Sequence, residues 1–484
     1  MKKHLLYIFL TVLVGMFCTC SNYDSFSTNP SFRLVFSDDT VRFDTLISTI
    51  PSPTKTLYVF NKNSDGLRVS NIRLQKGTES LFRVNVDGEY LANGSGYDYQ
   101  IRKNDSILVR IEVTMPESGN TDTVSYSDEL LFTLENGAQQ RVLLTAGSLD
   151  AYIVHGMYIH SDSILMTDKP YLIYDSLVVA KNAHLLLLPG TRLLMHDSTA
   201  VDVYGHINAN GTIEKPVVFR GARTDRMFDY LFYDNTPSRW KGINIHKGSD
   251  NNVFSNCDIH SGRWGISVEG SSLSEVALTL HNSIIHNVGG DGLQLFNCAA
   301  LVDNTQISNT LGCCVYIVGG ANTFRHCTIA QYYPLSYNRG DALYVANVDE
   351  EEKHHKLSHL NFLNCVITGY AEDVIMGNLS NQYEDFKNYS FRNCYLRTVG
   401  DNDDENFFFC KFENDKMELQ GEKNFKVFDT HNFIYDFTPD SLSQIRNMAE
   451  PIPNDLLYDR LGRSRFLDEA PDAGCYEYIM PVKK

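Results

Sequence analysis

Three side chains that could take part in acid–base chemistry occupy equivalent positions of a repeated phrase: His281, Asp303 and Arg325. Each stands directly before an Asn or His, which is followed by Cys, Ser or Thr, then any residue, then an aliphatic residue. On neighbouring parallel strands, about 4.8 Å apart, these side chains would touch. A histidine or arginine base beside a charge-neutralising group is what β-elimination from a uronic acid requires. The alternative is a solvated ion pair across strands, which contributes little.

The repeated phrase predicts a solenoid. Its copies begin 22 to 38 residues apart, and a period near 22 residues with longer insertions is typical of coils that stack equivalent residues. The copies begin at Asn256, Asn282, Asn304, His326, Asn364 and Asn393. Recurring Asn at one position suggests a turn ladder in which each side-chain amide bonds to the next coil.

A second sequence pattern predicts another strand in each coil. A small residue is followed by aliphatic residues at alternate positions, which point inward because side chains of a strand alternate between faces. The outward residues are Asn244, Ser267, Gln294, Tyr316 and Tyr344. They include no carboxylate, so glycoside hydrolysis by two carboxylates and metal-assisted proton abstraction lack their groups on this face. Tyr316 and Tyr344 are candidates for contact with sugar rings, the alternative being ordinary surface tyrosines.

The expected fold class is all-β. The two patterns predict a right-handed parallel β-helix over residues 161–400, in which stacking of coils closes the core. Residues 401–484 are expected to form C-terminal coils and a polar cap. Residues 32–147 contain short alternating strands separated by Asn, Asp and Gly, which predicts an antiparallel β-sandwich.

The N-terminal residues indicate export. Lys2 and Lys3 precede an apolar run at 5–17 that is too short to span a bilayer, as in a secretory signal peptide covering residues 1–20. Residues 21–31 form a polar tether. Cys20 stands after the apolar run and immediately before the tether. It resembles the acylated residue of a bacterial lipoprotein lipobox, the alternative being an ordinary secreted protein. Acylation would anchor the protein to the outer membrane, on the cell surface.

Composition limits partners and cofactors. The formal charge of −17 disfavours nucleic acid as a partner. Of eleven cysteines, four share one position of the repeat (Cys257, Cys327, Cys365 and Cys394), so we predict buried free thiols. No Cys-x-x-Cys pair occurs, and we expect no metal site and no cofactor. The acidic residues Asp401, Asp403, Asp404 and Glu405 could ligate calcium, although they lack EF-hand spacing.

Three segments resemble known families. Residues 185–219 resemble the opening coils of parallel β-helix proteins related to pectate lyases. The stretches 42–46, 58–61 and 82–88 look like the Ig-like module of Bacteroidota-type surface lipoproteins. Residues 459–465 and 471–477 are similar to the closing motif of the same β-helix proteins. The resemblance implies architecture only, because the wider fold includes lyases, hydrolases, esterases and adhesins.

These observations favour a non-enzymatic surface lipoprotein whose β-helix binds a glycan or another envelope component, with the membrane contacted through its lipid anchor. The rival hypothesis is a polysaccharide lyase or glycoside hydrolase that acts through the column of His281, Asp303 and Arg325 or through the insertion at 346–358. A purely structural envelope scaffold is a third possibility.

Overall fold

The computed structural model describes residues 25–228, 230–270, 272–400, 402–413, 420–452 and 455–479. The chain divides into two units, with the boundary between Leu149 and Asp150. The described residues form strands and five short 3-10 helices, and no α-helix occurs among them. The fold is therefore all-β, as the sequence predicts. The 3-10 helices are η1 (Gly77–Glu79), η2 (Ala92–Gly94), η3 (Tyr233–Asn235), η4 (Glu384–Lys387) and η5 (Gly421–Asn424).

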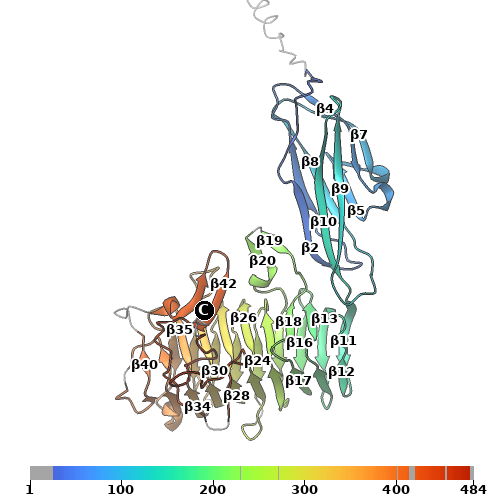
Figure 1. The fold of residues 1–484 in the computed structure, drawn as a ribbon. Coiled ribbons are helices and arrows are strands. Elements are labelled where there is room, and N and C mark those ends of the chain that lie inside the picture. The colour runs from blue at the N-terminus through green and yellow to red at the C-terminus, as the bar shows by residue number, and fades with distance from the viewer. Residues whose placement is uncertain are drawn as a thin grey trace, which may run out of the picture. The chain divides into compact units, whose positions relative to one another are not determined.

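The first unit is a β-sandwich of two five-stranded sheets around one apolar core (Figure 1). One sheet has the order β1 (Val35–Phe36), β3 (Lys55–Phe60), β8 (Ser106–Val113), β5 (Phe82–Val86), β6 (Glu89–Tyr90). The other has the order β2 (Thr40–Ile47), β10 (Gln139–Leu149), β9 (Val124–Leu134), β4 (Leu67–Leu74), β7 (Ser95–Ile101). Neighbouring strands are antiparallel except for β2 and β10, which are parallel. Alternating burial along β8 follows from the alternating apolar residues of its sequence.

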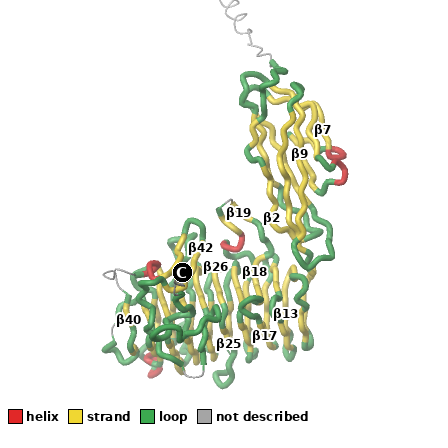
Figure 2. The backbone as a smooth tube through the Cα atoms, in the orientation of Figure 1, coloured by secondary structure: helices red, strands yellow, loops and turns green. Residues whose placement is uncertain are grey.

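The second unit is a parallel β-helix (Figures 1 and 2). A complete coil has three strands, for example β25, β26 and β27, of which the first joins a ten-stranded sheet and the other two an 18-stranded sheet. The ten-stranded sheet comprises β12 (Ser163–Leu165), β14 (His184–Leu187), β17 (His206–Asn210), β22 (Asn252–Ser255), β25 (Leu278–His281), β28 (Ala299–Asp303), β31 (Gly320–Arg325), β34 (Leu357–Leu363), β37 (Tyr389–Arg392) and β39 (Phe407–Phe408).

The 18-stranded sheet contains the remaining strands of the coils. They are β11 (Tyr152–Ile159), β13 (Tyr171–Val179), β15 (Arg192–Met195), β16 (Ala200–Val203), β18 (Val217–Gly221), β21 (Gly242–Ile245), β23 (Cys257–His260), β24 (Ile266–Glu269), β26 (Ile284–Val288), β27 (Leu293–Phe296), β29 (Gln306–Thr310), β30 (Val315–Val318), β32 (Thr328–Gln331), β33 (Leu343–Ala346), β35 (Val366–Gly369), β36 (Ile375–Asn378), β38 (Tyr395–Leu396) and β40 (Lys411–Phe412). The parallel sheet thus begins with β11, ahead of residue 161.

The Asn of the repeated phrase forms a corner between two strands of a coil. All six residues at this position have positive φ, between 48° and 58°, a left-handed conformation in which Asn and His are enriched. Their backbone N–H groups bond to the next coil, as in Asn282 N to the Asp303 carbonyl at 3.1 Å. The expected ladder of side-chain amides forms one rung, from Asn364 Nδ2 to His326 Nε2 at 2.8 Å. The amides of Asn304 and Asn364 also donate to the C-terminal segment.

The Cys, Ser or Thr after the corner forms a hydrogen-bond ladder through the interior. Each bond runs from a backbone N–H to the side chain of the next coil. The bonds are Cys257 N to Ser283 Oγ (3.0 Å), Ser283 N to Thr305 Oγ1 (3.4 Å), Cys327 N to Cys365 Sγ (3.4 Å) and Cys365 N to Cys394 Sγ (3.4 Å). Oxygen and sulfur both accept, which explains why the three residue types exchange at this position. The nine cysteines of the described residues are free and buried, as predicted.

Apolar side chains fill the interior of the coils. The rings of Phe324, Phe362, Phe391 and Phe407 stack in sequence, with centroids 4.7 to 5.2 Å apart. Aliphatic residues of the second pattern, such as Ile266 and Leu293, are fully buried. Each coil therefore buries its apolar face against its neighbours, as solenoid coils must.

Two segments outside the coils cover the outer surface. A short hairpin of β19 (Arg226–Phe228) and β20 (Leu231–Phe232) leads into η3, which lies beside β18. The C-terminal residues form a second hairpin, β41 (Phe425–Asp429) and β42 (Ile434–Pro439), and then return over the outer face of earlier coils. Tyr476 Oη donates to Gln306 Oε1 at 2.5 Å, and Cys475 N donates to Thr328 Oγ1 at 3.1 Å. The expected cap thus also shields a side of the β-helix.

The interior ladder leads to a first prediction, on Cys365. Cys365→Val keeps the volume but leaves the buried N–H of Cys327 without an acceptor, and we expect it to lower the free energy of unfolding by about 1–3 kcal/mol. Cys365→Ser retains an acceptor and should lose less. Urea unfolding followed by circular dichroism measures both values. A Val variant as stable as the Ser variant would show that the ladder contributes nothing.

Candidate functional site

The outward residues of the second pattern form one continuous column on the β-helix. One strand of each of five consecutive coils contributes to it, in the order Asn244 of β21, Ser267 of β24, Gln294 of β27, Tyr316 of β30 and Tyr344 of β33. All five side chains are partly exposed. The rings of Tyr316 and Tyr344 stack with centroids 5.0 Å apart and planes within 3°. The column therefore offers amide, hydroxyl and aromatic groups along one line.

A groove of about 500 Å³ borders this column. Its lining residues are Asn244, Arg263, Trp264, Ser267, Gly289, Gly290, Asp291 and Gln294. Trp264 Nε1 donates to Asn244 Oδ1 at 3.1 Å, and Ser267 Oγ donates to Gln294 Oε1 at 2.9 Å, so these side chains are held in place. Burial raises the pKa of the Asp291 carboxyl, and the hydrogen bond from Cys313 N offsets part of this effect. The groove combines an aromatic wall with fixed polar groups.

The column begins with a carboxylate that the sequence patterns did not reveal. Asp202 of β16 pairs with Asn244 in the sheet. It accepts hydrogen bonds from Asn244 Nδ2 at 2.9 Å and from His246 Nε2 at 2.8 Å. The expectation that this face lacks a carboxylate is therefore wrong at its first position. The reason is that β16 precedes the first recognisable copy of the second pattern.

The column of His281, Asp303 and Arg325 forms as predicted from spacing, since these residues pair across β25, β28 and β31. Arg325 and Asp303 make a bidentate ion pair, Nε to Oδ1 at 2.7 Å and Nη2 to Oδ2 at 2.6 Å. The side-chain hydrogen bond with Asp303 raises the pKa of Arg325. Burial lowers the pKa of the His281 imidazole. The three side chains are thus adjacent, but Asp303 and Arg325 are already paired with each other.

The C-terminal segment also engages this column. Asp455 accepts a hydrogen bond from Arg325 Nη1 at 2.7 Å, and the neighbouring corner residue Asn304 bonds to Tyr458 and Arg465. Arg465 in turn pairs with the buried Glu477. Arg325 therefore links the β-helix to its C-terminal segment, which is the role of a structural ion pair rather than of a base.

The insertion at 346–358 is tied down by Asp385 of η4. The Asp385 carboxylate accepts hydrogen bonds from Leu357 N at 2.6 Å and from His354 Nε2 at 3.1 Å. His355 pairs with Asp349 at 2.8 Å. Burial raises the pKa of Asp385, but hydrogen bonds from Leu357 N, His354 and Asn347 outweigh it and lower the pKa. The polar groups of the insertion thus hold it against the coils.

Two sequence hypotheses concern residues at or beyond the edge of the described chain. Cys20 lies outside the described residues, and no helix among the described ones is long and apolar enough to cross a membrane. Of the acidic stretch, Asp401 is also outside them, Glu405 pairs with Lys387 at 2.8 Å, and Asp404 accepts a hydrogen bond from Asn406 N. Acylation of Cys20 and calcium binding both stay predictions.

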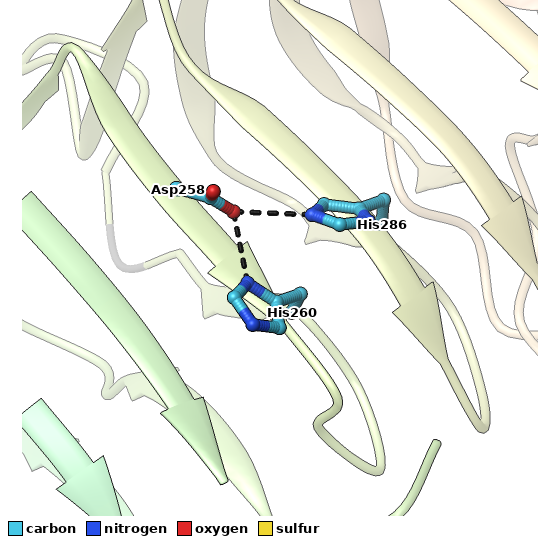
Figure 3. Close-up of side chains that lie close together, drawn as sticks. All are labelled: Asp258, His260 and His286. Atoms are coloured by element: carbon cyan, nitrogen blue, oxygen red, sulfur yellow. Dashed lines mark hydrogen bonds and ion pairs between the residues drawn. The ribbon is translucent and has the colours of Figure 1, made fainter. Parts of the chain in front are cut away.

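A cluster of charged side chains outside both predicted columns lies on β23 and β26 (Figure 3). Asp258 Oδ1 lies 2.9 Å from His260 Nδ1 and 3.1 Å from His286 Nε2. On the other side of the His260 ring, Nε2 lies 3.4 Å from Asp234 Oδ1, and Arg220 Nη2 lies 2.5 Å from the same oxygen. His260 is buried, whereas Asp258 and His286 are partly exposed.

The electrostatics of the cluster follow from these distances. Burial lowers the pKa of the His260 imidazole, but the attraction of Asp258 and contacts with both carboxylates outweigh it and raise the pKa to about 9. Burial raises the pKa of Asp258, and His260 and His286 outweigh that effect and hold it well below its usual range. In the described part of the chain, only Asp258, His260 and His286 form a group of three or more potential metal ligands.

A signal for this cluster was present in the sequence. His260 and His286 both stand one position after the aliphatic residue of the repeated phrase, in consecutive coils, and so project from equivalent positions. Asp234 belongs to the insertion between β18 and β21, which no repeat period predicts. Only the tertiary structure brings it beside His260.

Comparisons with known proteins support the architecture. A family described as "right handed beta helix region" matches residues 155–329. A search of curated proteins found none that matches the chain.

Three solved structures align with parts of the chain at TM-scores of 0.17 to 0.19, too low to carry an argument. A PapD-like domain of human CEP192 is 12% identical over 25% of this chain and 88% of its own. A family 123 glycoside hydrolase from Clostridium perfringens is 9% identical over 27% and 31%, respectively. A protein of unknown function from Porphyromonas gingivalis W83 is 12% identical over 26% and 59%.

A second prediction separates a structural from a catalytic role for the ion pair. Asp303→Asn leaves the partly buried Arg325 with a weaker partner, and we expect the free energy of unfolding to fall by about 1–3 kcal/mol. The matched control is Arg68→Gln in the sandwich, whose ion pair with Glu135 is exposed and should contribute under about 1 kcal/mol. Equal losses in chemical denaturation would contradict this role.

Proposed function

We propose that the protein is a cell-surface lipoprotein whose β-helix binds a glycan along the column from Asn244 to Tyr344. The observation that carries the proposal is the groove beside that column, because it places the Trp264 indole next to fixed amide and hydroxyl groups. Sugar rings present apolar faces that pack on aromatic rings and hydroxyls that need hydrogen-bond partners. A polar surface with aligned rings is suited to such a ligand.

The shape of the column fits an extended ligand better than a compact one. Side chains at equivalent positions of successive coils lie about 4.8 Å apart, so an extended polymer can contact several coils at once. Tyr316 and Tyr344 continue the line of Ser267 and Gln294 along the sheet. Each contact is weak, and affinity comes from their number.

The rival proposal of a polysaccharide lyase or glycoside hydrolase has less support. Arg325 and Asp303 are engaged with each other, and Asp455 takes a further donor of Arg325. The carboxylate of Asp202 accepts two hydrogen bonds. Catalysis at either place would first require breaking contacts that stabilise the fold.

Export and anchorage rest on the N-terminal sequence. The positive residues, the short apolar run and Cys20 together support a lipid-anchored protein at the outer membrane. A net charge of −17 would keep the protein from anionic headgroups, so the acyl chains would supply the membrane affinity. The polar tether then leaves the folded units free of the bilayer.

A third prediction tests glycan binding. A glycan array identifies the tightest ligand of the wild-type protein, and titration calorimetry with that glycan compares variants. Tyr316→Ala combined with Tyr344→Ala should weaken binding about tenfold, since each aromatic contact contributes about 0.5–1.5 kcal/mol. The control is Tyr90→Ala in the sandwich, a tyrosine that is 62% exposed, which should bind as wild type.

Several results would overturn this proposal. They are the absence of any bound glycan on the array, unchanged affinity in the double tyrosine variant, and equal loss in the Tyr90 control. A further one is release of unsaturated uronate products that His281→Ala abolishes, because that outcome assigns an enzymatic function to the other column.

A fourth prediction tests the anchor. Cys20→Ala removes the acylated residue, and we expect the protein to move from the membrane fraction to the soluble exported fraction, measured by fractionation and immunoblotting. The control is Cys18→Ala, two positions earlier, which should stay with the membrane. Retention of the Cys20 variant in the membrane would exclude the lipid anchor.

A further inference from the structure

The side chains of Asp258, His260 and His286 converge on one point. Two strands of consecutive coils supply them, with Asp258 and His260 on β23 and His286 on β26. In Figure 3 both imidazoles reach toward the carboxylate from neighbouring strands. Their ligand atoms, Oδ1, Nδ1 and Nε2, all lie within 4.8 Å of one another.

These distances suit a small divalent ion. Ligand atoms at about 2.0–2.2 Å from a tetrahedral ion are about 3.4 Å apart. The carboxylate oxygen lies 2.9 Å from one imidazole nitrogen and 3.1 Å from the other. An opening of a few tenths of an ångström therefore makes room for the ion.

A second carboxylate stands behind the buried histidine. His260 Nε2 makes no hydrogen bond of good geometry, but it lies 3.4 Å from Asp234 Oδ1. Ligation through Nδ1 leaves the ring proton on Nε2, the ring nitrogen that lies beside Asp234. A carboxylate that orients a metal-bound histidine in this way is a recurrent feature of metal sites. Arg220, 2.5 Å from Asp234, fixes that carboxylate in turn.

We propose that Asp258, His260 and His286 bind a divalent transition-metal ion such as Zn²⁺, with Asp234 as the partner that orients His260. Two imidazoles and one carboxylate favour zinc, cobalt or nickel over calcium and magnesium, which prefer oxygen ligands. This inference is independent of glycan binding, because none of the three ligands lines the groove.

The site keeps an open position. The side chains of Asp258 and His286 are 32% and 22% exposed, so the fourth ligand comes from the solvent side. Three protein ligands with one open position are typical of ions that bind water or substrate oxygen, whereas structural zinc sites are closed by four. The ion would therefore be able to contact an exogenous oxygen ligand.

The test uses the full chain, stripped with a chelator and then dialysed against Zn²⁺ or Co²⁺. We expect one ion per chain by elemental analysis, and ligand-field absorption of a low-coordinate Co²⁺ complex. His286→Ala and Asp258→Asn should abolish both signals. Asp234→Asn keeps all three ligands and should weaken binding on the order of 10–100-fold. Excess Ca²⁺ or Mg²⁺ should not displace the ion.

The matched control is His246→Ala. His246 pairs with Asp202 at 2.8 Å but has no second histidine ligand there, so its loss should leave ion binding unchanged. Circular dichroism confirms that each variant is folded, and both His286 and Asp258 are exposed enough to replace. The proposal is overturned if the wild-type chain retains no ion in excess Zn²⁺. It is equally overturned if folded His286→Ala and Asp258→Asn variants bind as wild type, or if His246→Ala loses the ion.

Discussion

The left-handed backbone at one residue of each coil is the constraint on which the β-helix depends. At that corner the chain turns from a strand of the ten-stranded sheet into a strand of the other sheet, with φ near 50°. Asn tolerates this conformation better than other residues that carry a Cβ atom. Because the corner recurs, its N–H always meets a carbonyl of the next coil. Every outward side chain then falls into a column.

Columns explain why residues that look reactive are not always functional. A column aligns side chains from different coils whether or not they cooperate, so His281, Asp303 and Arg325 become neighbours through register alone. The contacts of each side chain show whether it is available to a ligand. Arg325 is saturated by two carboxylates, Asp303 and Asp455, whereas the groups along the groove are partly exposed.

The C-terminal segment decides which outward residues over several coils are covered. It covers the outer residues of β29, β32 and β35 with apolar and polar contacts. Asp459, Asp472 and Glu477 accept backbone hydrogen bonds inside the segment, and Arg465 pairs with Glu477. The motif that resembles a closing signature is therefore a polar network that also bonds to the β-helix, as in Arg465 Nη2 to Asn304 Oδ1 at 2.7 Å. The segment also reaches the coil of the His–Asp cluster, because Arg460 Nε donates to the Ser283 carbonyl at 3.3 Å. None of its residues lines the groove.

The sequence by itself determined the repeat, and with it the all-β fold, the buried thiols and the membership of both outward columns except for Asp202. These follow from local rules, because strand alternation and corner chemistry act within one coil and repeat in the next. Even the two histidines of the cluster stood at equivalent positions of the phrase.

Only the tertiary structure decided which columns are covered and which groups meet from outside the repeat. Asp234 reaches His260 from an insertion, and Asp455 reaches Arg325 from 130 residues away. No period encodes such contacts, because they depend on how long segments pack against the finished β-helix. This packing gives Arg325 a second carboxylate partner, Asp455, and places Asp234 beside His260 of the His–Asp cluster.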